Sequence, residues 1–344
     1  MWTWTVNLIA LLLSIMWVVM FLKQSQAGLV STALTDKFTW GLYVQAFFFF
    51  SALAGGILVF ISIVTLFEID AFRKLAEIGS AVSLGCLAAA GMSLGSDLGK
   101  PFRSLKIATG KNFASPLTWD FITLSLCGIL NLLFLTGIIP GRGVGAMIWA
   151  VLCLIAALGF VMIHTLFFLS RVGAGFRSQP FLGLDTLAQS LWGGAALIVL
   201  LAVALEMEPF NLAKILLILT ILVLVPLVAA YIASLTTKSS GAEYKKIIAM
   251  DAILLIIFIL IQIGSPNNPV LLAIGSILIL IAVFLEKSHL IRQYQAKPIL
   301  PPPYSRYEEM PAYSPTSYEW IMSLGSVGAC VLVTSIIFYL KSGI

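Results

Sequence analysis

The sequence predicts an all-α integral membrane protein, and three observations support that fold class. Hydrophobic residues make up 60% of the 344 residues, whereas only 10% are charged. The mean hydropathy is +1.05, far above that of ordinary soluble domains. Apolar runs of about 20 residues, the length that a helix needs to cross a bilayer, recur along the whole chain. Because lipid cannot hydrogen-bond the backbone, we expect these runs to be helical.

We expect about ten spanning helices within one polytopic membrane domain, residues 1–344. Their predicted ranges are 4–22, 39–67, 77–97, 117–138, 145–170, 186–206, 212–236, 246–264, 269–287 and 318–341. Helix breakers such as Pro140, Pro209 and Pro266 separate neighbouring runs. No basic segment precedes the first run, so we expect a retained span there rather than a cleaved signal peptide.

Two glycine pairs lie inside predicted spans, Gly55-Gly56 in "ALAGGIL" and Gly193-Gly194 in "WGGAAL". Small residues allow transmembrane helices to approach each other closely. We therefore interpret both pairs as helix-packing sites rather than as phosphate-binding loops.

The basic residues predict an orientation. Ten spans put both termini on one side, and we call the opposite side, which carries the loops after the odd-numbered spans, face A. Most of the 20 lysines and arginines fall on face A, and the termini lie on the other side, face B. Because basic loops favour the cytoplasm, we expect face A to be cytoplasmic and the termini to lie outside. The same rule explains the net charge of +5 without a nucleic-acid partner.

The last long loop, residues 288–317, is rich in proline and tyrosine, with the stretch "AKPILPPPYSRYEEMPAYSPTSYEW" running through its end. Proline makes such a segment stiff and extended rather than helical. It suits either contact with a partner protein or a strap over the chain's own helices, and the sequence leaves both readings open.

The sequence offers few ligands for a metal or a haem. A transmembrane b-type haem needs two facing histidines, and the chain has only His164 and His289, with His289 expected beyond the end of its span. The cysteines lie inside apolar runs without ligand spacing, and no nucleotide-binding or zinc-protease motif occurs. We therefore expect no haem or metal in this chain.

Polar side chains inside a bilayer are costly, and those of this chain collect toward one face. At about 1.5 Å of rise per residue, six of them fall in the outer third of the bilayer at face A. They are Gln45, Asp97, Asp120, His164, Gln189 and Asp251. Each alone has an ordinary explanation, such as a helix cap, an ion pair or a satisfied interior histidine. Their convergence predicts a shallow polar pocket beneath a basic surface.

A quinone, either menaquinone or ubiquinone, fits such a pocket, because its ring needs hydrogen-bond partners and proton carriers while its tail stays in lipid. Phe47 is expected to help wall the pocket. The predicted proton carriers are Asp97, Asp120 and His164. The predicted quinone-binding residues are Trp40, Tyr43, Gln45, Lys100, Arg103, Trp119 and Gln189. Among them, Lys100 and Arg103 are expected to polarise a quinone oxygen or to hold carboxylates of a partner protein.

Four stretches carry a family resemblance: "FTWGLYVQAFFFFSALAGGIL" (38–58), "GSDLGKPFRSL" (95–105), "SPLTWDF" (115–121) and "YSPTSYEWIMSLGSVG" (313–328). The first three resemble the NrfD / polysulfide-reductase membrane-subunit family. The fourth resembles the entry to the last span in the ten-helix branch of that family. Predicted spans six to nine match only in hydropathy.

The resemblance implies a haem-free, quinone-reactive anchor in a prokaryotic cell membrane, with a core of two four-helix bundles. It further implies a ferredoxin-like iron–sulfur partner connected to a catalytic subunit. That subunit is expected to be a molybdopterin enzyme, with a hydrogenase or a multihaem cytochrome as alternatives. Tyr43 and His164 are candidates by their position in the membrane, not by a motif match.

Two further readings stay open. Glu68, Glu77 and Glu206 are expected at the face B ends of their spans, where they could open a proton path, although ordinary boundary carboxylates look the same. A secondary transporter with a shallow polar substrate site is the alternative function. The position of the ionisable groups near one face, rather than at the midplane, argues against it.

Overall fold

The protein folds into a bundle of long helices, seen here in a computed structural model. The structure describes residues 2–35, 38–99, 105–110, 112–139, 141–169, 182–204, 210–236, 268–295 and 313–342, with four residue pairs between 252 and 264. Within these ranges there is no strand, and nine helices are long and apolar enough to cross a membrane. The predicted all-α membrane fold is confirmed.

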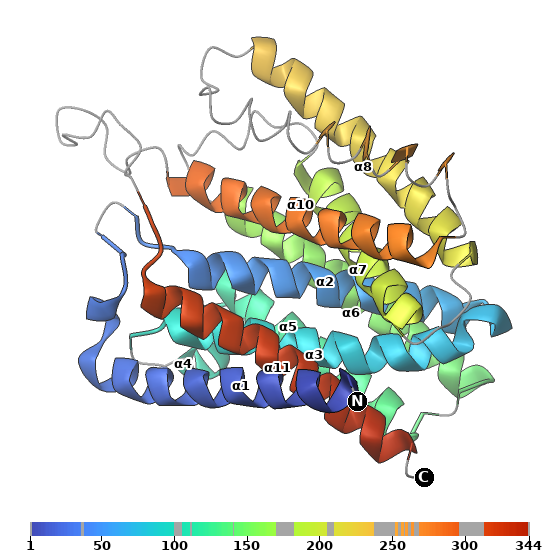
Figure 1. The fold of residues 1–344 in the computed structure, drawn as a ribbon, viewed down its shortest axis with the longest axis horizontal. Helices are drawn as coiled ribbons and strands as arrows, with labels where there is room; N and C mark the ends of the chain where they lie inside the picture. Colours follow the sequence, from blue (N-terminus) through green and yellow to red (C-terminus); the bar gives the residue numbers. More distant parts are fainter. Residues whose placement is uncertain are drawn as a thin grey trace.

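Nine long helices form the described bundle (Figure 1). They are α1 (Trp2–Ala27), α2 (Leu42–Leu66), α3 (Arg73–Asp97), α5 (Pro116–Leu135), α6 (Val144–Leu169), α7 (Leu182–Ala204), α8 (Phe210–Thr236), α10 (Pro269–Gln295) and α11 (Ser317–Ser342). Short turns of helix lie between them: η1 (Leu29–Ser31), η2 (Asp70–Phe72) and α4 (Leu105–Thr109). The predicted span 246–264 lies mostly outside the described residues, and the pairs described within it are helical.

One predicted boundary is wrong. Helix α10 does not end at 287 but continues to Gln295, so residues 288–295 belong to the helix and not to the expected loop. The physical reason is that polar side chains in this last part find partners within the bundle. Ser288 donates to Oε1 of Gln45, and Nε2 of Gln295 donates to the carbonyl of Trp40. The part of the expected loop from 296 to 312 lies outside the described residues.

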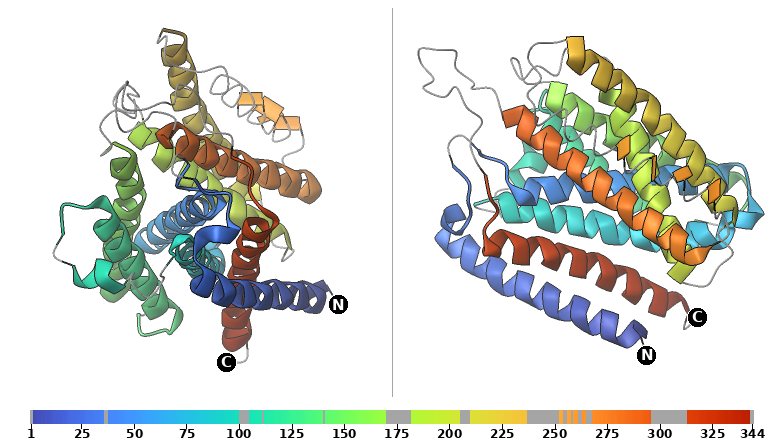
Figure 2. Two further views of the ribbon diagram at one scale, coloured as in Figure 1. Left: turned by 90° about the vertical axis from the view of Figure 1, so that its left-hand side faces the viewer. Right: turned by 45° about the horizontal axis from the view of Figure 1, so that its top comes forward.

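Helix α2 is the centre of the fold. It packs against α3 and α6, and α5 closes a four-helix ring by contacting both of those helices. On another side of α2 lies α7, which is itself covered by α8 and α10. Helix α11 packs on α3 and carries α1 at the outside of the bundle (Figure 2). The predicted spans thus build one complete four-helix bundle within the described part of the chain.

One glycine from each pair lies where α2 crosses α7, and there Gly56 and Gly194 meet. A Cβ atom on Gly194 would lie only 2.7 Å from the backbone carbonyl carbon of Gly56 and from the backbone nitrogen of Ile57. Real side chains do not tolerate such distances, so glycine is needed for this helix crossing. The packing role predicted for both pairs is confirmed.

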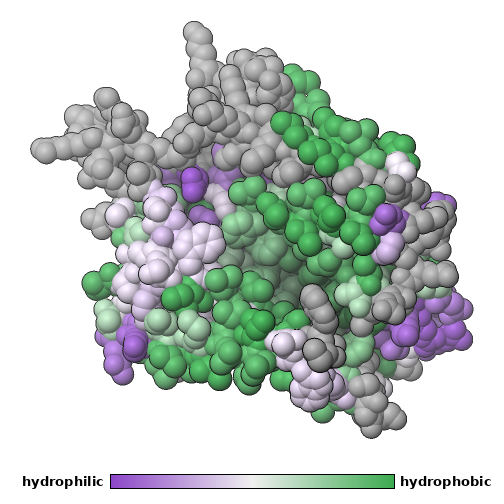
Figure 3. All heavy atoms as spheres, viewed as in Figure 1, coloured by the Kyte–Doolittle hydropathy of each residue, from purple (hydrophilic) through white to green (hydrophobic). Residues whose placement is uncertain are grey.

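The two ends of the bundle are polar and its middle is apolar. Apolar side chains cover the middle of the face seen in Figure 3, and hydrophilic ones gather toward both ends, as a bilayer requires. Both termini lie at the same end of the bundle (Figure 1), as expected for an even number of spans. That end is face B, and α2 begins at the opposite end, face A.

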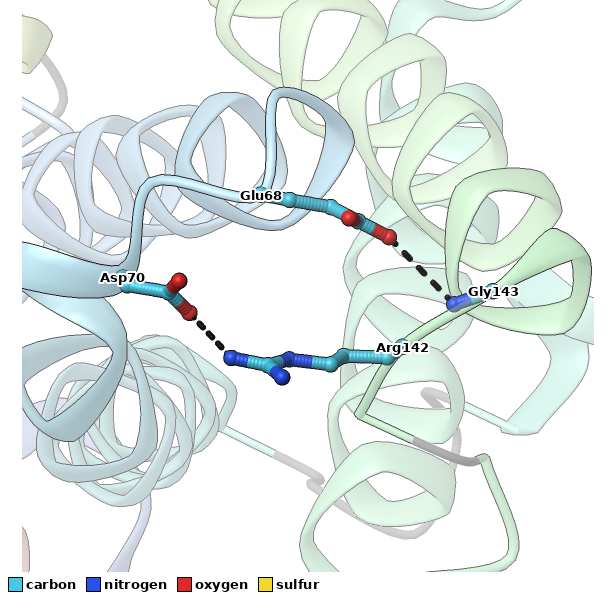
Figure 4. Close-up of polar contacts among 4 residues, drawn as sticks. All are labelled: Glu68, Asp70, Arg142 and Gly143. Carbon is cyan, nitrogen blue, oxygen red and sulfur yellow. Dashed lines mark hydrogen bonds and ion pairs between the residues drawn. The ribbon is translucent and has the colours of Figure 1, made fainter.

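At face B, two loops are held together by exposed polar contacts (Figure 4). Arg142, before α6, forms an ion pair with Asp70, between α2 and α3, and these side chains are 60% and 71% exposed. The backbone nitrogen of Gly143 donates to Oε1 of Glu68 at 3.4 Å. Glu68 also lines a shallow cleft with Glu77, and Glu206 lies outside the described residues.

Candidate functional site

A histidine and an aspartate meet inside the bundle near face A. His164 comes from the last two turns of α6, and Asp120 from the first two turns of α5. Nε2 of His164 lies 3.1 Å from Oδ1 of Asp120, and the side chains are only 2% and 7% exposed. The distance suits an ion pair, although the orientation of the two groups does not satisfy a hydrogen bond. Ionisable groups so deep in spanning helices usually have a function.

Aromatic rings surround the imidazole of His164. The ring centroids of Phe48, Phe160 and Phe47 lie 4.9, 5.0 and 5.9 Å from it. Nδ1 of His164 is buried and has no hydrogen-bond partner among the described residues. An imidazole nitrogen is a strong hydrogen-bonding group and would be costly to leave unpaired. The site therefore combines flat apolar walls, a free polar atom and a carboxylate that can stabilise an imidazolium.

A second polar cluster lies between α2, α7 and α10. Nζ of Lys287 donates to Oε1 of Gln189 at 2.9 Å, and Nε2 of Gln189 donates to Oδ2 of Asp185 at 3.2 Å. Ser288 donates to Oε1 of Gln45 at 3.0 Å. Gln45 and Gln189 are therefore both hydrogen-bonded to residues of α10.

The hydroxyl of Tyr43 points toward a third polar group. It contacts Oε1 of Gln24 and Sδ of Met322, each at 3.2 Å. Nε2 of Gln24 in turn donates to the carbonyl of Ser96. Asp97, at the end of α3, lies near Tyr43, and its Oδ1 is buried without a hydrogen-bond partner among the described residues. Tyr43 and Asp97 thus lie together.

A carboxylate that the sequence did not indicate organises the loop before α2. Glu319, in the first turn of α11, is 0% exposed. It accepts hydrogen bonds from the backbone of Ala33 at 3.1 Å and from the Tyr313 hydroxyl at 2.6 Å. That hydroxyl also accepts from the backbone nitrogen of Leu42 at 2.7 Å. Burial and the nearby Glu319 raise the pKa of Tyr313, so its hydroxyl stays a donor.

The remaining predicted residues lie elsewhere. Trp40 packs its ring on Phe167, three residues from His164, at 5.0 Å between centroids. Trp119 is 46% exposed, and its indole donates to the carbonyl of Phe113, so it is not part of the buried cluster. The predicted residues that lie outside the described part of the chain are Lys100, Arg103 and Asp251.

Three functional candidates were missed by the sequence reasoning because of span boundaries. Asp185 directly precedes the predicted span 186–206, and Lys287 is the last residue of the predicted span 269–287. Glu319 is the second residue of the predicted span 318–341, where a carboxylate is ordinary. The signal for Lys287 was its neighbourhood: Glu286, Lys287 and Ser288 follow an apolar run without a proline or glycine to end the helix.

In the part of the chain that the structure describes, no three His, Cys, Asp or Glu side chains come together as a metal site. The fold and the site define a polytopic helical membrane protein with an acid–base pair buried near one face. The chain belongs to the NrfD family: the sequence model described as "Polysulphide reductase, NrfD" matches residues 30–297. The resemblance seen in the sequence motifs is confirmed.

A relative from Halobacterium salinarum is named as a putative membrane subunit of dimethyl sulfoxide reductase. It is 29% identical over 202 residues, which cover 52% of this chain and 46% of that protein. The match thus spans about half of each protein.

Proposed function

We propose that this chain is the haem-free, quinone-reactive membrane subunit of a respiratory oxidoreductase complex. It passes electrons between an iron–sulfur partner subunit and the menaquinone or ubiquinone pool. The observation that carries the proposal is the buried pair of His164 and Asp120, with an unpaired imidazole nitrogen among phenylalanine rings. The family assignment supports it.

The residues around His164 fit a quinone head group. Nδ1 of His164 would be a hydrogen-bond partner for one carbonyl oxygen of the quinone, and the rings of Phe47 and Phe48 would supply flat apolar walls. A bound quinone supplies two-electron chemistry coupled to two protons. His164 is the group that takes or gives a proton at the ring, because an imidazole can act as a general acid or base. Asp120 orients the imidazole and stabilises its charged form.

The other predicted residues have supporting roles. Asp97 stays a candidate proton carrier, since its Oδ1 is buried and unpaired. Trp40 extends the aromatic wall through Phe167. Lys100 and Arg103 are proposed to hold carboxylates of the partner protein at face A. The hydroxyl of Tyr43 is already engaged by Gln24, which makes it a positioning residue rather than a ligand of the ring.

The proposed partners follow from the family and from the relative. The relative's name places that protein in a dimethyl sulfoxide reductase, which supports a multi-subunit reductase here as well. We propose a ferredoxin-like iron–sulfur subunit at face A and a molybdopterin catalytic subunit beyond it, with hydrogenases and multihaem cytochromes as alternatives. Face A is proposed to be cytoplasmic. A reporter that works only outside the cytoplasm should then be active when it is fused to the C-terminus.

Purification of the tagged chain from its native membrane tests the proposal. We expect an iron–sulfur protein to co-purify, extractable quinone in the complex, and electron transfer from menadiol or decylubiquinol to an artificial acceptor. A chain that purifies alone, without quinone or quinol-dependent electron transfer, would contradict the proposal. Substrate uptake by that solitary chain in liposomes would favour the transporter instead.

A further inference from the structure

Lys287 is buried to an unusual degree for a lysine. Its side chain is 2% exposed and lies in a spanning helix, where an ammonium group is costly. Lysines near helix ends normally extend toward the membrane surface. Lys287 instead turns into the bundle and donates to Gln189 on α7. A lysine held in this way calls for a reason beyond helix packing.

The amide of Gln189 links this lysine to a carboxylate. Its oxygen accepts from Lys287, and its nitrogen donates to Oδ2 of Asp185. The other carboxylate oxygen, Oδ1 of Asp185, is buried and has no hydrogen-bond partner among the described residues. Oδ1 of Asp185 is therefore available to bind a proton.

Further ionisable groups lie close to the cluster. Glu286, beside Lys287 on α10, brings a second carboxylate near Asp185. Among the described side chains, His289 and Arg292 are the other charged or titratable groups on this part of α10, and α6 brings His164. Helix α2 has no charged residue, and the only one in α8, Lys214, is exposed. In a low-dielectric interior, a carboxylate oxygen without a hydrogen-bond partner, such as Oδ1 of Asp185, favours binding a proton.

The cluster lies next to the His164 site. A Cβ on Gly183, two residues before Asp185, would contact Cγ2 of Thr165 at 3.7 Å, and Thr165 follows His164 on α6. On α2, Gln45 accepts from Ser288, and Phe48, one turn further on, packs on His164. Two acid–base groups thus flank the first turns of α2 at the same end of the bundle.

We propose that Asp185, Gln189 and Lys287 form a second proton-binding site, which takes one of the two protons exchanged in the quinone reaction. The inference rests on the proposed function. In quinol oxidation, two electrons leave to the iron–sulfur partner, one proton goes to His164, and the Asp185 carboxylate takes the other to become a carboxylic acid. Quinone reduction runs the same transfers in reverse. Lys287 and Gln189 hold Asp185 in position for this exchange.

A purely structural role is the competing explanation, because buried polar groups can fix the register of helices. The test uses the purified complex with Asp185→Asn or Lys287→Met, and with Asp70→Asn and Lys214→Met as matched controls at exposed positions. Menadiol turnover is measured against pH. Redox-induced infrared difference spectra, recorded with menadione as the quinone, follow the carboxyl C=O band.

We expect Asp185→Asn to lower kcat about 100-fold, the lower end of typical losses in acid–base catalysis, and Lys287→Met to lower it as well, while the controls do not. The wild-type carboxyl band should disappear in Asp185→Asn and persist in Asp70→Asn. Gln189→Glu keeps an oxygen acceptor for Lys287. It is the variant to measure if the complexes with Asp185→Asn and Lys287→Met do not assemble. It should shift the carboxyl band and the pH dependence of kcat.

Variants with the kcat, pH profile and carboxyl band of the controls would overturn the second site while leaving quinone turnover by the wild type intact. A wild-type complex without menadiol turnover and without a menadione-dependent infrared signal would instead overturn the proposed function. The two failures are therefore distinguishable.

Discussion

The two ends of the bundle hold the same chemical pairing in opposite surroundings. At face A, the carboxylate of Asp120 meets His164 deep inside the helices. At face B, the carboxylate of Asp70 meets Arg142 on the surface, with both side chains mostly exposed (Figure 4). Each pair joins segments far apart in the chain, but the pairs differ in their exposure to solvent and in the basic group, an imidazole at face A and a guanidinium at face B.

The difference teaches where to look for function. An exposed ion pair is worth about 0–1 kcal/mol and is screened by salt, so Arg142 and Asp70 form a modest loop clasp. A buried pair loses its hydration and gains little net stability over apolar residues. The burial of the Asp120–His164 pair at face A is therefore poorly explained by a gain in stability. It is better explained by a role in proton transfer.

The largest expected effect separates the two ends directly. Asp120→Asn keeps the shape of the side chain but removes the charge that supports a protonated His164. We expect it to lower menadiol turnover about 100-fold or more, as loss of acid–base catalysis typically does. Turnover of the purified complex is measured, together with the yield of assembled complex.

Asp70→Asn is the matched control, because it makes the same chemical change at the exposed end. It should retain wild-type turnover. Equal turnover in Asp120→Asn and Asp70→Asn would remove Asp120 from the mechanism and end the functional contrast between the two faces.

An intermediate effect is expected at Tyr313, which ties the start of α2 to α11. Tyr313→Phe loses the hydrogen bond to Glu319 and leaves the backbone nitrogen of Leu42 without its acceptor. We expect a loss of about 1–3 kcal/mol of stability, measured as a lower midpoint of thermal unfolding in detergent. An unchanged midpoint would mean that these contacts do not anchor α2.

The same residue predicts a pH dependence. The pKa of Tyr313 is raised in the folded protein, because burial and Glu319 favour the neutral hydroxyl. The unfolded chain therefore loses this proton first, and the stabilisation is complete below the unfolded pKa of about 10 and falls as the pH rises above it. In Tyr313→Phe this alkaline decline should be smaller. An identical alkaline decline in the variant would show that another group causes it.

The smallest effect is expected at the face B clasp. Arg142→Ala should cost at most about 1 kcal/mol, and the cost should shrink at high salt. Thermal unfolding at low and high ionic strength measures it. A loss several times larger, or one that salt does not reduce, would show that the exposed pair matters more than its surroundings predict.

Hydropathy predicted the spans, and the small size of the glycines predicted their role in helix packing. Hydropathy could not predict which residues lie on the same side of a helix, because depth along a helix says nothing about the angle around it. Tyr43 and Gln45 lie at nearly the same depth, yet one contacts Gln24 and the other Ser288. The roles assigned to Lys100 and Arg103 remain predictions.

Binding of a quinone analogue tests the central claim most directly, because it needs no partner subunit. The full-length chain in detergent is titrated with the quinone-site inhibitor 2-heptyl-4-hydroxyquinoline N-oxide, whose fluorescence is quenched on binding. We predict saturable binding to the wild type and to Arg142→Gln. In His164→Gln we predict about 5- to 150-fold weaker binding, since loss of one buried hydrogen bond costs about 1–3 kcal/mol. No saturable binding, or equal affinity in all three proteins, would contradict a quinone site at His164.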